Sequence, residues 1–171
     1  TQLHQVVDRD ALFRNYHYLS GVNATVRKHL AELAHEAIKV AKLKAVYGLG
    51  SRDLVLDIGA NDGEFLRHFQ EYGRIGYDPA KNIVSDAYER IPDYFSAAHY
   101  LGSGFRHAKL VSSLAMFYDL VEPTKFAQDV AGILASDGLW VCEMNYLGSM
   151  LQNNAYDFIG HEHVAEYSLQ A

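Results

Sequence analysis

The chain has 171 residues, of which 49% are hydrophobic and 21% charged, a balance that fits one folded domain with its own core and excludes a disordered chain. The net charge of −6 argues against a surface that coats nucleic acid, and no run of about 18 apolar residues is present to cross a membrane. The single cysteine, Cys142, excludes an internal disulfide and a four-cysteine zinc site within this sequence. Because no basic-then-apolar leader is present either, we expect a soluble, cytoplasmic protein.

The first 22 residues are predicted to be irregular, and they are rich in aromatic side chains. Tyr16, His17 and Tyr18 follow one another directly. Such a cluster either lines a pocket or packs its rings on the domain as a surface turn. The sequence leaves both interpretations open.

A long helix follows this aromatic segment. Asn23 or Thr25 can cap its start, and apolar residues recur at helical spacing through the next five turns. Lysines are frequent in its last turns, where cations suit the helix dipole. We expect the helix to run to about Tyr47, with Gly48 as the stop signal.

A short apolar run at 53–58 predicts a buried strand, and a loop of small residues leads from it into a helix expected at 63–72. In open α/β sheets this arrangement binds ligands at the carboxyl end of the strand. A dinucleotide site needs Gly-x-Gly-x-x-Gly, but after Gly59 and Gly63 no third glycine falls in register. The alternative is a strand, turn and helix that bind nothing.

The same loop carries three carboxylates, Asp57, Asp62 and Glu64. They would repel a pyrophosphate but attract a ligand with a positive sulfonium and a free amino group. The loop chemistry therefore favours S-adenosyl-L-methionine (SAM) over a nicotinamide dinucleotide.

The second strand is predicted at 74–77 and ends at Asp78-Pro79. Asp78 lies 21 positions beyond Asp57. In a strand–helix–strand unit, an acidic residue at about this distance accepts hydrogen bonds from ribose hydroxyls. The alternative is an exposed Asp-Pro turn.

The remaining core alternates between helices and strands. We expect helices at 80–90 and 122–134, a loop at 102–106, a turn at Asp137-Gly138, and strands at 91–96, 109–116 and 139–144. This rhythm predicts an α/β fold, a doubly wound, Rossmann-like and mainly parallel sheet, with the N-terminal helix as an extension.

The tail from 145 to 171 departs from this rhythm. A short helix is expected within 145–154, and His161-Glu162-His163 then follows a strand end, where open sheets place their sites. Two histidines two positions apart lack the His-Glu-x-x-His spacing of a zinc site, so a metal is disfavoured and none is assigned. Acid–base chemistry fits better, because histidine titrates near neutrality beside a carboxylate, and a polar loop without chemistry is the alternative.

The segment Asp57-Ile58-Gly59-Ala60-Asn61-Asp62-Gly63, together with Asp78-Pro79, resembles the SAM-binding core of class I methyltransferases. Segments 115–123 and 146–169 resemble, more narrowly, the C-methyltransferases that act on nucleotide-linked deoxy-keto-sugars, and the aromatic segment at 16–20 resembles their substrate-facing segment. The resemblance implies SAM as cofactor, held by Asp57, Gly59, Ala60, Asn61, Gly63, Asp78, Pro79, Ser96, Ala115 and Met116.

The resemblance also implies methylation of a carbon next to a ketone. His163 would be the base that removes the α-proton, and the other catalytic residues would be Glu162, His161, Tyr16 and Tyr156. The position of Gly160 often holds Tyr or Cys in such enzymes. A hydroxyl that polarises the keto oxygen is therefore missing there, and Tyr16 or Tyr156 is expected to substitute.

We expect three parts: an aromatic segment and helix at 1–48, the SAM-binding core at 49–146, and a catalytic and substrate tail at 147–171. Related enzymes carry a four-cysteine zinc module before this region and an α/β domain after it, and this sequence starts without Met. It is therefore expected to be a fragment. The alternatives are an O- or N-methyltransferase, a SAM-binding module that is silent alone, and, disfavoured, a nicotinamide oxidoreductase.

Overall fold

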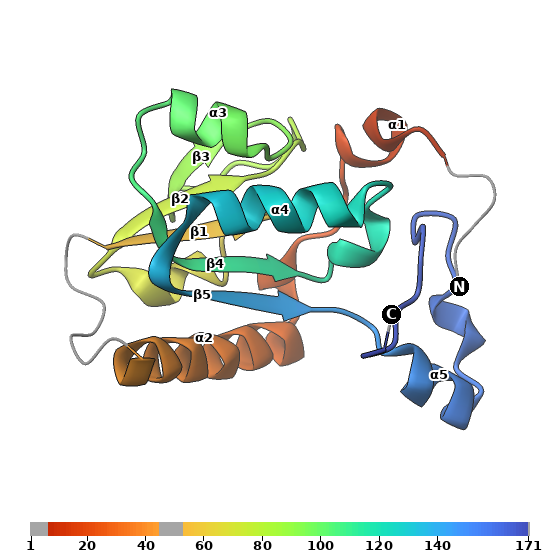
Figure 1. The fold of residues 1–171 in the computed structure, drawn as a ribbon. Helices are drawn as coiled ribbons and strands as arrows, with labels where there is room; N and C mark the ends of the chain where they lie inside the picture. The colour runs from red at the N-terminus through yellow and green to blue at the C-terminus, as the bar shows by residue number, and fades with distance from the viewer. Residues whose placement is uncertain (1–6, 45–52, 171) are drawn as a thin grey trace.

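A five-stranded parallel sheet forms the centre of the computed structural model, which describes residues 7–44 and 53–170 (Figure 1). Its order is β3-β2-β1-β4-β5, and all four pairings are parallel. The chain builds outward from β1 through β3 and then crosses back to place β4 on the other side of β1. This order confirms the doubly wound sheet. The strands are β1 Leu54–Ile58, β2 Gly73–Tyr77, β3 Glu89–Ile91, β4 Ala108–Leu114 and β5 Leu134–Glu143.

Helices cover both faces of the sheet (Figure 1). Side chains alternate along a strand, so neighbouring residues of β1 face opposite sides of the sheet. Val55 packs into the cluster between the sheet and α2 (Ala24–Lys44), whereas Leu56 packs into the cluster on the other face, with α3 (Ala97–Gly102) and α4 (Pro123–Ile133). Both strand residues are fully buried. The central strand is therefore apolar on both sides, as a doubly covered parallel sheet requires.

Several predicted elements are confirmed. Helices α2 and α4 begin within one residue of their expected starts, and β1, β2 and β4 lie within two residues of the predicted strands. The expected helix end at Tyr47 and the stop at Gly48 lie outside the described residues. Strand β5 begins earlier than expected, and its register jumps from the Ala108–Leu134 pair to the Leu110–Leu139 pair. The predicted Asp137-Gly138 turn falls in this irregular part of the strand.

The helices predicted at 63–72 and 80–90 are wrong, and the third strand, predicted at 91–96, lies earlier, at Glu89–Ile91. The first is only a 3₁₀ turn, Leu66–Phe69, and the second is a series of turns that ends in β3. After the strand, Ser96 caps helix α3 by accepting a hydrogen bond from the backbone N–H of His99. Both connections keep exposed residues, such as Arg67 and Val84. In the second connection, Ser85 and Tyr88 donate their hydroxyl hydrogens to the carbonyls of Asp62 and Asn61, each at 2.7 Å, so contacts with the loop after β1 fix its path.

The described part of the N-terminal segment and the tail both lie at the carboxyl edge of the sheet (Figure 1). The N-terminal segment is not wholly irregular as predicted, because it contains α1 (Arg9–Phe13) and a 3₁₀ turn, Ser20–Val22. The tail contains the expected short helix, α5 (Leu147–Asn153), and a 3₁₀ turn, Tyr156–Phe158. No helix in the described part of the chain is long and apolar enough to span a membrane.

Candidate functional site

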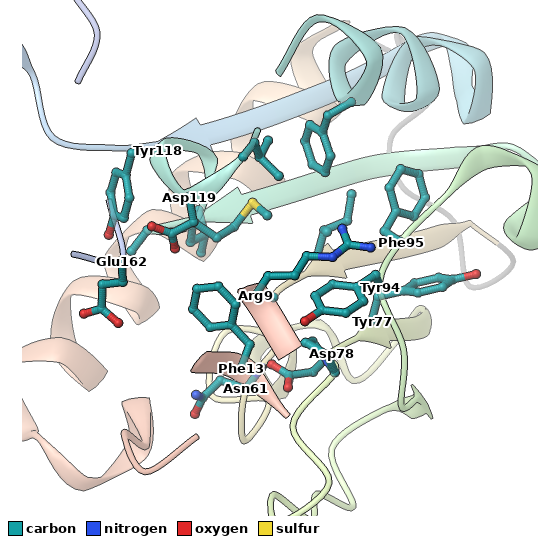
Figure 2. A pocket seen from close by; sticks show the side chains of 18 of the residues that line it. Arg9, Phe13, Asn61, Tyr77, Asp78, Tyr94, Phe95, Tyr118, Asp119 and Glu162 are labelled. Atoms are coloured by element: carbon teal, nitrogen blue, oxygen red, sulfur yellow. Dashed lines mark hydrogen bonds between the residues drawn. The ribbon is translucent and has the colours of Figure 1, made fainter. Parts of the chain in front are cut away.

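A cavity of about 680 Å³ opens at the carboxyl ends of β1, β2 and β4. Figure 2 shows Asp78 and Phe95 towards one end, and Tyr118, Asp119 and Glu162 gathered at the other. The volume lies in the range of small-molecule and cofactor sites. The walls come from the strand ends, from the segment at 93–96, from the N-terminal segment and from the tail.

The loop after β1 brings bare backbone to the cavity. Gly59 has a φ of +80°, and its N–H donates to the carbonyl of Tyr77 at 2.8 Å, which ties the turn to β2. Gly59 and Asn61 line the cavity, whereas the neighbouring Ala60 is buried behind them. Gly63 does not line it, because its Cα faces the ring of Tyr88, 2.6 Å from where a Cβ would stand. Ala60 and Gly63 thus shape the loop rather than contact a ligand in the cavity.

Asp78 stands at the tip of β2 and lines the cavity together with Pro79. Its Oδ2 accepts the N–H of Asn61 at 2.8 Å, and its Oδ1 accepts the N–H of Ala80 at 2.8 Å. Burial raises the pKa of this carboxyl, and the two backbone hydrogen bonds oppose that rise. Each oxygen keeps a further lone pair, so the group can accept two hydroxyl donors from a ribose.

Asp57 lies behind the cavity and does not line it. Its Oδ1 accepts the hydroxyl hydrogen of Ser112 at 2.7 Å, and complete burial raises its pKa to about 7. The other two loop acids also point elsewhere: Asp62 accepts the N–H of Gly21 at 2.8 Å, and Glu64 also faces Gly21. The carboxylates expected to surround a cationic ligand are thus not those of the loop.

Other carboxylates supply the negative charge of the cavity. They outnumber the arginine and lysine that line it, Arg9 and Lys125, and come from five different segments: Asp78, Asp93, Asp119, Glu122, Asp129 and Glu162. An acidic cavity was expected from the loop acids Asp57, Asp62 and Glu64, but the acids that line it are others. Those acids are far apart in the sequence, and only the fold brings them together.

An apolar slot extends from Asp78 along the sheet edge. Phe95 packs edge-on against Tyr77 and Phe126, and Ser96, Ala115 and Met116 also line the cavity. Ala115 holds an unusual φ of +53°, stabilised by donation of its N–H to the carbonyl of Glu143 at 2.9 Å. A flat aromatic base would fit between such side chains.

The segment from 9 to 21, here called the N-terminal strap, crosses the open edge of the sheet. The side chain of Asn61 holds it twice, donating to the carbonyl of Tyr18 at 2.9 Å and accepting the N–H of Ser20 at 3.1 Å. Tyr16 and Tyr18 line the cavity, and the guanidinium of Arg9 lies 3.9 Å over the ring of Tyr94. Sequence reasoning missed Arg9 and Tyr94, since no motif or periodicity marks a pair 85 positions apart.

The tail brings Glu162 and His163 into the same cavity. Nδ1 of His163 is hydrogen-bonded to the carbonyl oxygen of Phe158, and a carbonyl can only accept. The neutral ring therefore carries its proton on Nδ1, which leaves Nε2 as the basic nitrogen. The ring packs against that of Tyr118 at a tilt of 46°, with centroids 4.2 Å apart, and this contact restricts its orientation.

The remaining predicted residues lie outside this cavity. His161 lines a smaller neighbouring cavity of about 450 Å³, and Tyr156 is 57% exposed and lines neither. Gly160 adds no side chain, and an added Cβ would approach only Glu162, at 3.9 Å. Among residues 7–44 and 53–170, no three His, Cys, Asp or Glu side chains gather as a metal site.

These features fit SAM at one end of the cavity. The carboxylate of Asp78, the backbone of Gly59 and Asn61, and the slot beside Phe95 suit a ribose, a backbone-contacting chain and an aromatic base. The surplus of acids suits a sulfonium and an amino group. Glu162 and His163 remain free at the far end for a second molecule.

The sequence matches the methyltransferase domain family over residues 9–171. It is 32% identical to the C-methyltransferase NovU of Streptomyces niveus over 175 residues, which cover 98% of this chain and 40% of NovU. The chain thus spans less than half of that relative's length.

Two plantazolicin methyltransferases have the same fold. The structure of BamL with a triazolic desmethylPZN analog and S-adenosylhomocysteine (SAH) superposes with a TM-score of 0.64 at 13% identity, over 86% of this chain and 59% of BamL. BpumL with a pentazolic analog and SAH gives 0.63 at 13% identity, over 81% of this chain and 55% of BpumL.

Proposed function

The chain belongs to the methyltransferase family, as a class I enzyme whose cofactor is SAM, and from this premise we propose that it methylates a carbon next to a ketone. The proposed acceptor is a small molecule, a nucleotide-linked deoxy-keto-sugar, and the proposed location is the cytoplasm. The observation that carries the proposal is His163, an oriented base in the same cavity as the proposed ribose carboxylate, Asp78. The identity to a C-methyltransferase supports it.

The strand ends would hold the donor. Asp78 would accept the ribose hydroxyls, the backbone at Gly59 and Asn61 would contact the amino acid part, and Phe95 and Met116 would enclose the base. When bound, the cofactor supplies an electrophilic methyl group on a sulfonium centre. The acidic side chains that line the cavity would stabilise this positive charge electrostatically, without a covalent bond to it.

The acceptor is activated by His163. Its Nε2 takes the proton from the carbon next to the ketone, while the bond from Nδ1 to the carbonyl of Phe158 holds the ring in place. Glu162 lies beside it in the cavity, and Tyr16 faces both from the strap. Burial and the nearby charges of Glu162 and Asp119 raise the pKa of Tyr16 to about 12, so its phenol stays protonated and can donate a hydrogen bond.

His161 and Tyr156 have a supporting role in this proposal. His161 flanks the neighbouring cavity, and Tyr156 lies in the 3₁₀ turn that contains the carbonyl partner of His163. Neither lines the main cavity, so we propose no direct contact with the reacting carbon.

The experiment measures solvent deuterium uptake at the α-carbon of a thymidine-diphosphate 4-keto-6-deoxyhexose, without methyl donor. The wild-type protein should catalyse the exchange. Replacing His163 by Ala should lower its rate at least about 100-fold and leave SAH affinity unchanged, because the base lies away from the donor end. Replacing His35 by Ala, at an exposed histidine of α2, is the matched control and should change the exchange rate less than about threefold.

Exchange that survives in His163→Ala would remove this residue as the base. The chain covers 40% of NovU, which favours one further candidate, a domain that binds SAM and is silent in isolation. That candidate predicts SAH binding without exchange by the wild-type protein.

A further inference from the structure

Asp119 lies where two cavities meet. It follows β4 in the 3₁₀ turn Phe117–Asp119, and it lines both the main cavity and the smaller one. Glu162 of the tail and Arg9 of the N-terminal strap also line both cavities. Figure 2 shows Asp119 and Glu162 next to each other at the end opposite Asp78. The reaction proposed above assigns no chemical role to this carboxyl.

The surroundings of Asp119 favour its neutral form. Its Oδ1 is shielded from solvent and has no hydrogen-bond partner in the described part of the chain. Burial, together with the charges of Glu162 and Glu166, raises the pKa of Asp119 to about 8. An acid that is protonated at neutral pH and has a spare O–H is a hydrogen-bond donor.

The groups that face Asp119 come from three segments. The tail contributes Glu162, His163 and Glu166; the strap contributes Tyr16 and Arg9; and its own turn contributes Tyr118. Burial raises the pKa of Glu166, and His163, with its Nδ1 3.5 Å from Oε1, opposes that rise. His163 thus contacts Glu166, and Asp119 faces two acids, Glu162 and Glu166.

We propose that the protonated carboxyl of Asp119 is a catalytic group that donates a hydrogen bond to the ketone oxygen of the acceptor. The inference rests on the proposed function and assigns the oxygen-stabilising role that Gly160 cannot fill. It places the donor on a residue that lines both cavities, and thus in the same cavity as the base. Tyr156 is exposed and lines neither cavity, so it does not substitute as expected.

The step balances without a further reactant. The α-carbon–hydrogen bond breaks, its proton goes to Nε2 of His163, and its electron pair becomes the enolate. Asp119 keeps its proton and shares it with the oxygen on which the charge develops. The enolate carbon then takes the methyl group, while the carbon–sulfur bond breaks and leaves its electron pair on sulfur.

The test again uses deuterium exchange into the thymidine-diphosphate 4-keto-6-deoxyhexose, without methyl donor. Replacing Asp119 by Ala should slow the exchange about 100- to 1000-fold, the loss typical of one oxyanion donor. Replacing it by Asn preserves the volume and an N–H donor, and should retain the rate within about tenfold. Asp157→Asn, an exposed acid of the tail, is the matched control and should behave like wild type.

The pH profile separates a donor from a structural role. The wild-type exchange rate should fall above about pH 8, as Asp119 loses its proton, and in Asp119→Asn this fall should disappear. Unchanged SAH affinity, measured by calorimetry, shows that each variant is folded.

Two results would overturn the inference alone: exchange by Asp119→Ala within threefold of wild type, or an alkaline fall that persists in Asp119→Asn. Absence of exchange in the wild-type protein would instead overturn the proposed function, and the inference with it.

Discussion

The buried carboxyl of Asp57 should make the stability of this protein depend on pH. Its pKa rises from 3.8 to about 7 because burial disfavours the charge, while Ser112 opposes the rise through its hydrogen bond. Between those two values the folded chain holds a proton that the unfolded chain has lost. Stability therefore falls as the pH rises through this window. At about 1.4 kcal/mol per pH unit, the loss approaches about 4 kcal/mol above pH 7.

Replacing Asp57 by Asn removes this titration and keeps the volume. The amide oxygen can still accept the hydroxyl of Ser112. We expect equal stability near pH 4 and a gain of about 2–4 kcal/mol at pH 8, which corresponds to roughly 5–15 °C in melting temperature for a chain of this size. Asp119, whose pKa is also raised, is unchanged in the variant, so the difference isolates Asp57.

Urea unfolding at pH 5, 6, 7 and 8, without ligand, measures the effect. Asp86→Asn, at an exposed acid, serves as the matched control, which should change stability by less than about 1 kcal/mol at every pH. The compared quantity is the difference in the free energy of unfolding between Asp57→Asn and the wild type. If this difference stays constant from pH 5 to pH 8, or if the variant is less stable at pH 8, Asp57 is ionised and stabilised in the folded chain. The side chain lies behind the cavity, so SAH affinity should stay within threefold; a larger loss would support the direct cofactor contact expected from the sequence.

Three further substitutions test the donor half of the site. Asp78→Ala should weaken SAH binding by about 1–3 kcal/mol, roughly 5- to 150-fold by calorimetry, through lost charge-assisted hydrogen bonds; unchanged affinity would place the ribose elsewhere. Gly63→Ala should cost at least about 1–3 kcal/mol in urea unfolding, because its φ is +80° and a Cβ would meet Tyr88, whereas Gly102→Ala, with open space around it, should cost little. Asn61→Ala should release the N-terminal strap, seen as faster amide hydrogen exchange there; unchanged protection would mean that other contacts hold it.

The donor half could be predicted because its signals are local. The apolar run of β1, the glycine loop and the acid at the tip of β2 lie within about 25 consecutive residues, and each has a short-range physical signature. Gly59 and Asp78 consequently line the cavity as expected. The side-chain direction of Asp57 was not predictable in this way, because it depends on Ser112 in the neighbouring strand.

The failed helices at 63–72 and 80–90 show where local patterns mislead. Their apolar residues suit a helical face, and Leu66 and Tyr88 are indeed buried, although neither segment forms an α-helix. Tyr88 turns inward to donate its hydroxyl hydrogen to the carbonyl of Asn61 at 2.7 Å. Tertiary contact with the loop after β1 therefore outweighs helix propensity, which is a weak preference of less than about 1 kcal/mol per residue.

The acceptor half could be predicted only in part, for a different reason. Its groups come from the strap, from the turn after β4 and from the tail, so Tyr16, Asp119 and His163 are neighbours only in the folded chain. The sequence marks His163 by its histidine–acid context, but nothing around Asp119 distinguishes it from a surface acid. Its pKa is raised by burial and, in addition, by the charges of Glu162 and Glu166, which face it from the tail. Burial and charge from a distant segment, rather than local sequence, therefore make this carboxyl a hydrogen-bond donor, and substitutions in the tail should move the alkaline limit of the exchange reaction.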